Sequence, residues 1–105
     1  MKTLTMCGSM RFEKEMQQIA FLLETRYGFN VLQCTYSNKN PTEMEKENIV
    51  KAHNKKIDLS DAVYIVDIDN HIGISVQSEI EYAVNKNKEI IYHSAFISDI
   101  NKISI

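Results

Sequence analysis

A chain of 105 residues is long enough for one domain with a single core and too short for two, and its 44% hydrophobic content is enough to form that core. One proline and three glycines argue against a disordered chain. The net charge of −2 argues against the basic face that a nucleic-acid polymer requires, so we expect no such partner.

The N-terminal residues and the cysteines indicate the compartment. No run of residues approaches the length of a membrane span, and residues 1–5 lack the apolar core of a signal peptide. Cys7 and Cys34 fit neither a disulfide framework nor a C-x-x-C metal motif, and both lie in apolar, strand-like segments. We therefore expect a cytoplasmic protein with reduced thiols, no membrane association, and no metal or other cofactor.

The first third of the chain predicts a strand, a helix and a second strand. Residues 2–7 form a short apolar run, and a glycine and a serine follow it as a turn. Apolar residues then recur at helical spacing from Phe12 to Tyr27, where Gly28 predicts the C-terminal stop. Residues 30–35 (NVLQCT) are a second strand candidate.

The middle of the chain predicts a helix and the clearest strand. A polar loop over 36–42 contains the only proline, and Thr42 can cap a helix that runs from about Glu43 to Ser60. Residues 62–67 (AVYIVD) are apolar at five of six positions, as expected for a central parallel strand covered on both faces.

The last third predicts one more helix and one more strand. After a loop over 68–74, an apolar stripe at helical spacing indicates a helix that ends near 85–88. Residues 89–93 (EIIYH) form a fourth strand candidate, and residues 94–105 are left as a further turn or a short helix.

This alternation of strands and helices predicts an α/β fold built from βαβ units. Right-handed crossovers favour a parallel sheet of about four strands in the order 2-1-3-4, with helices on both faces. The expected architecture is a three-layer sandwich of the Rossmann or flavodoxin kind, in a single domain over 1–105. Ligands of such sheets bind beyond the carboxyl ends of the strands, at the switch point between strands 1 and 3. That rule selects the loops after Met6 and after Asp67.

The loop after the first strand (residues 7–11, CGSMR) has the composition of an anion-binding turn. Gly8 lets the backbone approach a ligand, Ser9 offers a hydroxyl, and Arg11 can add a charge-assisted hydrogen bond. An ordinary turn with an N-cap and a solvated arginine explains the same residues. The loop is neither a G-x-G-x-x-G fingerprint nor a P-loop, so dinucleotide and triphosphate sites are not indicated.

The segment after the third strand carries the candidate catalytic acid. Gly73 and Ser75 lead into the helix, and Glu79 lies one turn further on, at the border of the buried stripe. A partly desolvated carboxylate there can attack an anomeric carbon or stabilise an oxocarbenium-like transition state. The alternative is structural, because acids favour first helical turns and Ser78-x-x-Glu81 matches a capping box.

Taken together, three segments resemble the nucleoside 2-deoxyribosyltransferase superfamily, and most closely its small N-glycosidase members, which include the deoxynucleoside 5'-monophosphate N-hydrolases. The segments are 7–11 (CGSMR), 56–62 (KIDLSDA) and 73–83, and the resemblance extends from Thr3 to about Tyr92.

The resemblance implies a site and a mechanism. Glu79 matches the family's nucleophile, which displaces the base before water or a second base resolves the glycosyl-enzyme. The loops that hold the sugar and phosphate are matched by Cys7, Gly8, Ser9, Arg11, Gly73 and Ser75. Because a neighbouring subunit often completes the pocket in this family, the resemblance also implies a homodimer or larger homo-oligomer.

Two positions depart from the family's pattern. His53 stands where the family carries an aspartate that contacts the sugar or base, and Asp69 could take the acidic role instead. Without the family position, His53 is interpreted as a packed, hydrogen-bonded histidine. Glu81 stands where the family commonly has a glycine. These departures question transferase activity more than the fold or the class of ligand.

The sequence therefore leads to one main hypothesis and two alternatives. The main one is cleavage or transfer at the N-glycosidic bond of a (deoxy)nucleoside or its 5'-monophosphate through Glu79. The first alternative is a non-catalytic nucleotide-binding or sensing module on the same fold. The second, a glycohydrolase of nicotinamide dinucleotides, depends on Glu79 alone. The base, the sugar and the need for a phosphate stay open.

Overall fold

Four parallel strands form one sheet in the order β2-β1-β3-β4, as the sequence predicts. The computed structural model describes residues 1–36 and 40–103. The strands are β1 (Thr3–Gly8), β2 (Asn30–Leu32), β3 (Ala62–Val66) and β4 (Glu89–Tyr92). β1 pairs with both β2 and β3, so the switch point lies at β1 and β3.

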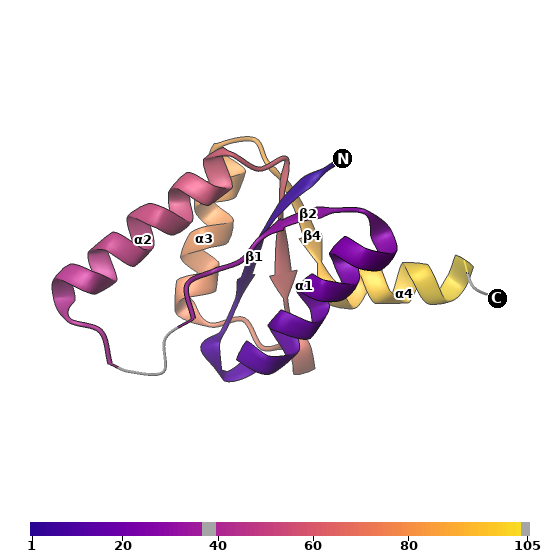
Figure 1. Cartoon of the computed structure of the whole chain (residues 1–105), viewed down its shortest axis with the longest axis horizontal. Helices are drawn as coiled ribbons and strands as arrows, with labels where there is room; N and C mark the ends of the chain where they lie inside the picture. The colour runs from indigo at the N-terminus through magenta and orange to yellow at the C-terminus, as the bar shows by residue number, and fades with distance from the viewer. Residues whose placement is uncertain (37–39, 104–105) are drawn as a thin grey trace.

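Helices cover both faces of this sheet (Figure 1). The elements between and after the strands are η1 (Met10–Phe12), α1 (Glu13–Tyr27), α2 (Glu43–Asp58), η2 (Ile68–Asn70), α3 (Ile74–Asn85) and α4 (His93–Ile103). Helices α1 and α4 lie on one face, and α2 and α3 lie on the other. The predicted three-layer α/β sandwich is therefore confirmed.

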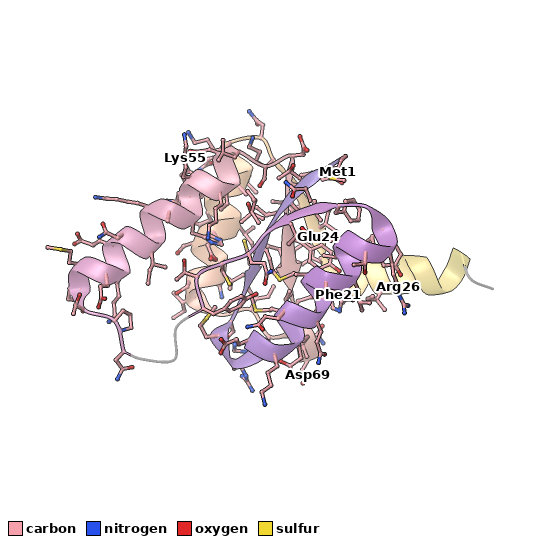
Figure 2. All side chains as sticks on the ribbon, in the orientation of Figure 1. Met1, Phe21, Glu24, Arg26, Lys55 and Asp69 are labelled. Carbon is pink, nitrogen blue, oxygen red and sulfur yellow. The ribbon has the colours of Figure 1, made fainter. Side chains whose placement is uncertain are left out.

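Alternation along β3 divides the core between the two faces. Tyr64 and Val66 belong to the cluster that packs against α1, whereas Val63 and Ile65 belong to the cluster that packs against α2 and α3. All five residues of β3 are buried, which explains why its sequence is an almost continuous apolar run. The opposite side of α1 faces water, where Phe21 is 65% exposed (Figure 2).

Local signals set several ends of the helices as predicted. Gly28 ends α1 in the left-handed conformation, with φ of 71°. Thr42 begins α2 with a capping box, because its hydroxyl accepts from the N–H of Glu45 and the Glu45 carboxylate accepts from the N–H of Thr42.

Several boundaries differ from the prediction. β1 covers Thr3–Gly8 rather than 2–7, and β3 ends at Val66 rather than 67. β2 stops at Leu32 rather than 35, and the carbonyl of Gln33 accepts a hydrogen bond from Lys56 Nζ at 2.7 Å. α2 ends at Asp58 rather than near 60. His93 begins α4 instead of ending β4, and the tail forms a helix as far as Ile103. Within the described residues, no helix has the length and apolarity to span a bilayer.

Candidate functional site

A cavity of about 950 Å³ opens at the carboxyl end of β1, between α2 and α3. Its walls come from the loop after β1, the segment after β2, one face of α2, and the first half of α3. This is the end of the sheet at which parallel α/β folds bind ligands.

The cavity gathers most of the residues that the sequence singles out. Six of them line it: Gly8, Ser9, His53, Gly73, Ser75 and Glu79. Cys7 has no exposed surface and lies at the side of this group, in contact with His53.

Besides Cys7, two predicted residues do not line the cavity, and both lie away from the site. Arg11 is exposed, and its guanidinium lies over the ring of Phe12, 5.2 Å from the ring centroid. The short helix η1 lies between β1 and α1 and carries Arg11 to the outside. Asp69 is exposed at the lower edge of the molecule in Figure 2, with a left-handed φ of 55°. The structure therefore gives neither residue a contact with the space that Glu79 faces.

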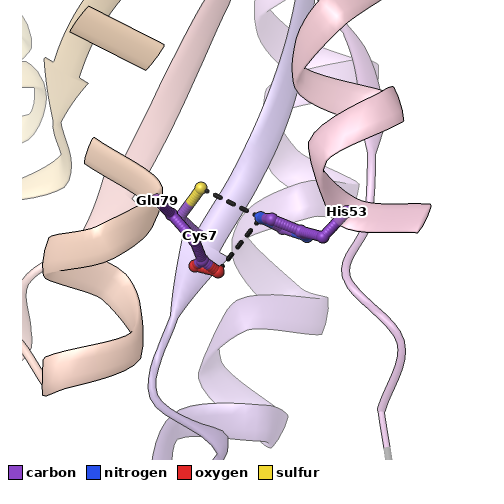
Figure 3. Close-up of side chains that lie close together, drawn as sticks. All are labelled: Cys7, His53 and Glu79. Carbon is purple, nitrogen blue, oxygen red and sulfur yellow. Dashed lines mark hydrogen bonds and ion pairs between the residues drawn. The ribbon is translucent and has the colours of Figure 1, made fainter. Parts of the chain in front are cut away.

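Three side chains from three elements meet beside this cavity. Cys7 comes from β1, His53 from α2 and Glu79 from α3, and His53 points from its helix between the other two (Figure 3). His53 Nε2 lies 3.3 Å from Cys7 Sγ and 3.1 Å from Glu79 Oε1. We call these residues the Cys7–His53–Glu79 cluster.

Burial sets the protonation of this cluster. It raises the pKa of Glu79 from 4.5 to about 7 and lowers the pKa of His53 from 6.5 to about 4, where the charge of Lys56 acts in the same direction. Burial also raises the pKa of the Cys7 thiol well above its ordinary value, with smaller contributions from Glu79 and Cys34. At neutral pH the thiol and the imidazole are therefore uncharged, and Glu79 is poised between its two forms.

The two oxygens of Glu79 have different surroundings. Oε1 faces His53, and the neutral imidazole tautomer with its proton on Nε2 donates a hydrogen bond to it. Oε2 is buried and has no hydrogen-bond partner among the described residues. An unpaired buried oxygen costs free energy, so this oxygen distinguishes Glu79 from an ordinary surface acid.

Apart from His53, sequence reasoning missed the residues of α2 that line the cavity. Lys46, Val50 and Asn54 line it, and their spacing of four residues places them on one helix face beside His53. Val50 is 57% exposed. The helical spacing from His53 is the signal that could have identified this wall. Tyr82, on α3, also lines the cavity and donates a hydrogen bond to Asp58 Oδ1 at 2.8 Å.

The fold and the site together define an α/β domain with a half-buried carboxylate at the carboxyl end of a parallel sheet. No family model, no curated protein and no solved structure matched the chain.

Proposed function

We propose that this protein cleaves or transfers at the N-glycosidic bond of a nucleoside or nucleoside 5'-monophosphate, with Glu79 as the nucleophile. One observation carries the proposal: Glu79 lines the cavity at the carboxyl end of β1 with one oxygen bound by His53 and the other without a partner. A carboxylate oriented by a donated hydrogen bond at the wall of a cavity is placed to attack a substrate bound there.

The chemistry then follows in two displacements. A carboxylate oxygen of Glu79 attacks the anomeric carbon, the C–N bond breaks, and the base departs with the bonding electrons and takes up a proton. The resulting glycosyl ester is resolved by water, which gives the free sugar, or by a second base, which gives a new nucleoside. Either route returns Glu79 as a carboxylate.

The cavity supports a ligand of this size and polarity. Its volume of about 950 Å³ falls within the ~300–1,000 Å³ of small-molecule sites. Ser9 and Ser75 line it near the starts of η1 and α3, where hydroxyls and free backbone N–H groups suit a sugar or a phosphate. The resemblance of 7–11 and 73–83 to the 2-deoxyribosyltransferase superfamily supports the same class of substrate.

His53 is the positioning residue in this proposal. Its Nε2 lies 3.1 Å from Glu79 Oε1, so a donated hydrogen bond fixes the rotamer of the carboxylate and favours its charged form. Because the pKa of His53 is lowered to about 4 by burial, the imidazole stays neutral and does not form a permanent ion pair that would quench the nucleophile.

Assembly and compartment belong to the same proposal. Ile74 and Val50 line the cavity and are 84% and 57% exposed, which suits coverage by a second copy of the chain. Light scattering on the purified protein tests for a homodimer or larger homo-oligomer. Both cysteines are free, which is typical of a reducing compartment such as the cytoplasm.

The test uses chromatography to measure the release of base from ribo- and deoxyribonucleosides and their 5'-monophosphates. We expect the wild type to release base from at least one member, and Glu79→Gln to lower that rate by about 10³-fold or more, a loss on the order of 4 kcal/mol in transition-state stabilisation. Glu81→Gln is the matched control, since Glu81 is an exposed acid on the same helix, and we expect it to keep the wild-type rate.

Two results would contradict the proposal. An unchanged rate in Glu79→Gln would rule out Glu79 as the nucleophile. A wild type that releases no base, with or without an acceptor base, would rule out cleavage or transfer at the N-glycosidic bond. If such an inert protein were stabilised against heat by one of the nucleotides, the non-catalytic binding module would be the better explanation.

A further inference from the structure

We propose that the Cys7–His53–Glu79 cluster is a binding site for a zinc ion, with three protein ligands and a fourth position open to the cavity. The sequence shows no metal motif because the three residues are far apart in the chain and come from three different elements. Packing of α2 and α3 against β1 brings them together (Figure 3).

The donor atoms are those that zinc prefers. A cysteine sulfur, a histidine nitrogen and a carboxylate oxygen are each ligands that zinc takes in proteins. Here the ligand atoms of the three residues all lie within 4.8 Å of one another. Softer and harder ions are less well matched by this set, since Mg²⁺ and Ca²⁺ require oxygen donors and Cu⁺ prefers thiolates and thioethers.

The separations also fit a tetrahedral ion. Bonds of about 2.3 Å to sulfur and about 2.0–2.2 Å to nitrogen and oxygen place neighbouring ligands roughly 3.4–3.6 Å apart. The observed separations are 3.3 Å between Cys7 Sγ and His53 Nε2 and 3.1 Å between His53 Nε2 and Glu79 Oε1. These two separations fall short of the tetrahedral values by only a few tenths of an ångström, and Cys7 Sγ lies within 4.8 Å of the Glu79 carboxylate.

The cavity gives the site its open position. His53 and Glu79 line the cavity while Cys7 is fully buried, so a fourth ligand can reach the ion from the cavity side. Three protein ligands with one exchangeable position are typical of zinc ions that take water or a substrate group. A zinc ion would also give the Glu79 carboxylate a cationic partner, whereas its Oε2 is buried without a hydrogen-bond partner among the described residues.

Zinc and the glycosidic reaction compete for the same carboxylate. Binding of Zn²⁺ would form a sulfur–zinc bond with release of the Cys7 thiol proton to solvent, would require the His53 proton to move from Nε2 to Nδ1 so that Nε2 can bind the ion, and would engage the oxygen of Glu79. The zinc site itself does not depend on the proposed function, but the following consequence does. Zinc should inhibit base release, and a chelator should restore the rate of base release.

The test measures metal binding directly on the full-length protein after dialysis against a chelator. Zinc affinity is obtained by competition with a chromophoric chelator, and cobalt(II) is used as a spectroscopic substitute that reports a thiolate ligand through its charge-transfer absorption. We expect one equivalent of zinc per chain, and an affinity lowered at least about tenfold in Cys7→Ser, His53→Gln and Glu79→Gln.

Cys34→Ser and His71→Gln are the matched controls. Cys34 is a free thiol that lines the same cavity, and His71 lies in the loop before α3, but neither belongs to the cluster. We expect both controls to bind zinc as the wild type does. Far-UV circular dichroism shows which variants are folded, and if Cys7→Ser is not, the His53 and Glu79 variants decide the result.

The outcomes separate this inference from the proposed function. A wild type that binds zinc no more tightly than the cluster variants, or a cobalt complex without thiolate absorption, overturns the metal site even if base release occurs. Stoichiometric zinc binding that needs all three residues supports the site, even in a protein that releases no base.

Discussion

The carboxylate of Asp67 accepts two hydrogen bonds from Ser94, which lies 27 residues later in the first turn of α4. Asp67 Oδ1 accepts from the backbone N–H of Ser94 at 2.9 Å, and Oδ2 accepts from its hydroxyl at 2.7 Å. The residue that follows β3 therefore caps the helix that follows β4. This contact explains why α4 begins directly at His93, without an intervening loop.

Removal of this cap should destabilise the fold. We expect Asp67→Ala to lower the free energy of unfolding by about 1–3 kcal/mol. The substitution removes the cap of the first turn of α4 and leaves the Ser94 N–H without its acceptor. Ser94→Ala should cost less, since the backbone bond survives. Urea unfolding followed by circular dichroism measures both. Ser98→Ala, an exposed position of the same helix, is the control, and an Asp67→Ala midpoint equal to that of Ser98→Ala would refute the cap.

The pH dependence of stability should contain a contribution from His93. Burial lowers the pKa of His93, with the charge of Asp67 opposing it, and the Tyr64 hydroxyl lies 2.6 Å from Nδ1. A histidine whose folded pKa is lower than its unfolded value of ~6.5 stabilises the fold fully above that value, and this contribution is lost as the pH falls through the folded pKa. The contribution of His93 to stability should therefore decrease on acidification, whereas the raised pKa of Glu79 acts in the opposite direction.

The comparison of wild type with His93→Gln isolates this contribution from that of His53, which acts in the same direction. We expect the difference in unfolding free energy between the two proteins to change between about pH 7.5 and about pH 5, with the wild type losing more on acidification. Urea unfolding at both pH values measures it. Parallel losses in the two proteins would show that His93 does not titrate differently in the folded state.

Gly8 should be required for packing, in addition to any contact with a ligand. A Cβ added there would lie 2.8 Å from Met16 Sδ and 3.1 Å from Val66 Cβ. We expect Gly8→Ala to cost about 1–3 kcal/mol in unfolding free energy from overpacking. Gly73→Ala is the control, because a Cβ there meets nothing closer than His71 Nε2 at 3.9 Å. Thermal unfolding compares them, and equal melting temperatures would contradict the crowding around Gly8.

The fold could be predicted because its signals are local. The apolar run of β3 indicates a strand buried on both faces, and Gly28 and Thr42 indicate ends of helices through their own backbone chemistry. The extent of α4 could not be predicted, since its first turn depends on Asp67, which is distant in the chain.

The site was predictable only to the level of the sheet edge. The rule that ligands bind at the carboxyl ends of parallel strands selects Ser9 and Glu79, and both line the cavity. The direction of Arg11 depends on the short helix η1, which periodicity does not reveal. The contact of His53 with Cys7 depends on how α2 packs against β1, so no spacing in the sequence could indicate it.

His53 should affect turnover more than substrate binding. We expect His53→Phe, which fills a similar volume but cannot donate to Glu79 Oε1, to lower kcat by about 10–100-fold with little change in KM, the equivalent of one lost hydrogen bond of ~1–3 kcal/mol. His53→Gln keeps an N–H donor and should recover part of the loss, which a merely structural role would not produce. Steady-state base release in the presence of a chelator, with His71→Gln as the control, measures these effects. A His53→Phe protein that is folded and has the wild-type kcat would show that Glu79 needs no help from the imidazole.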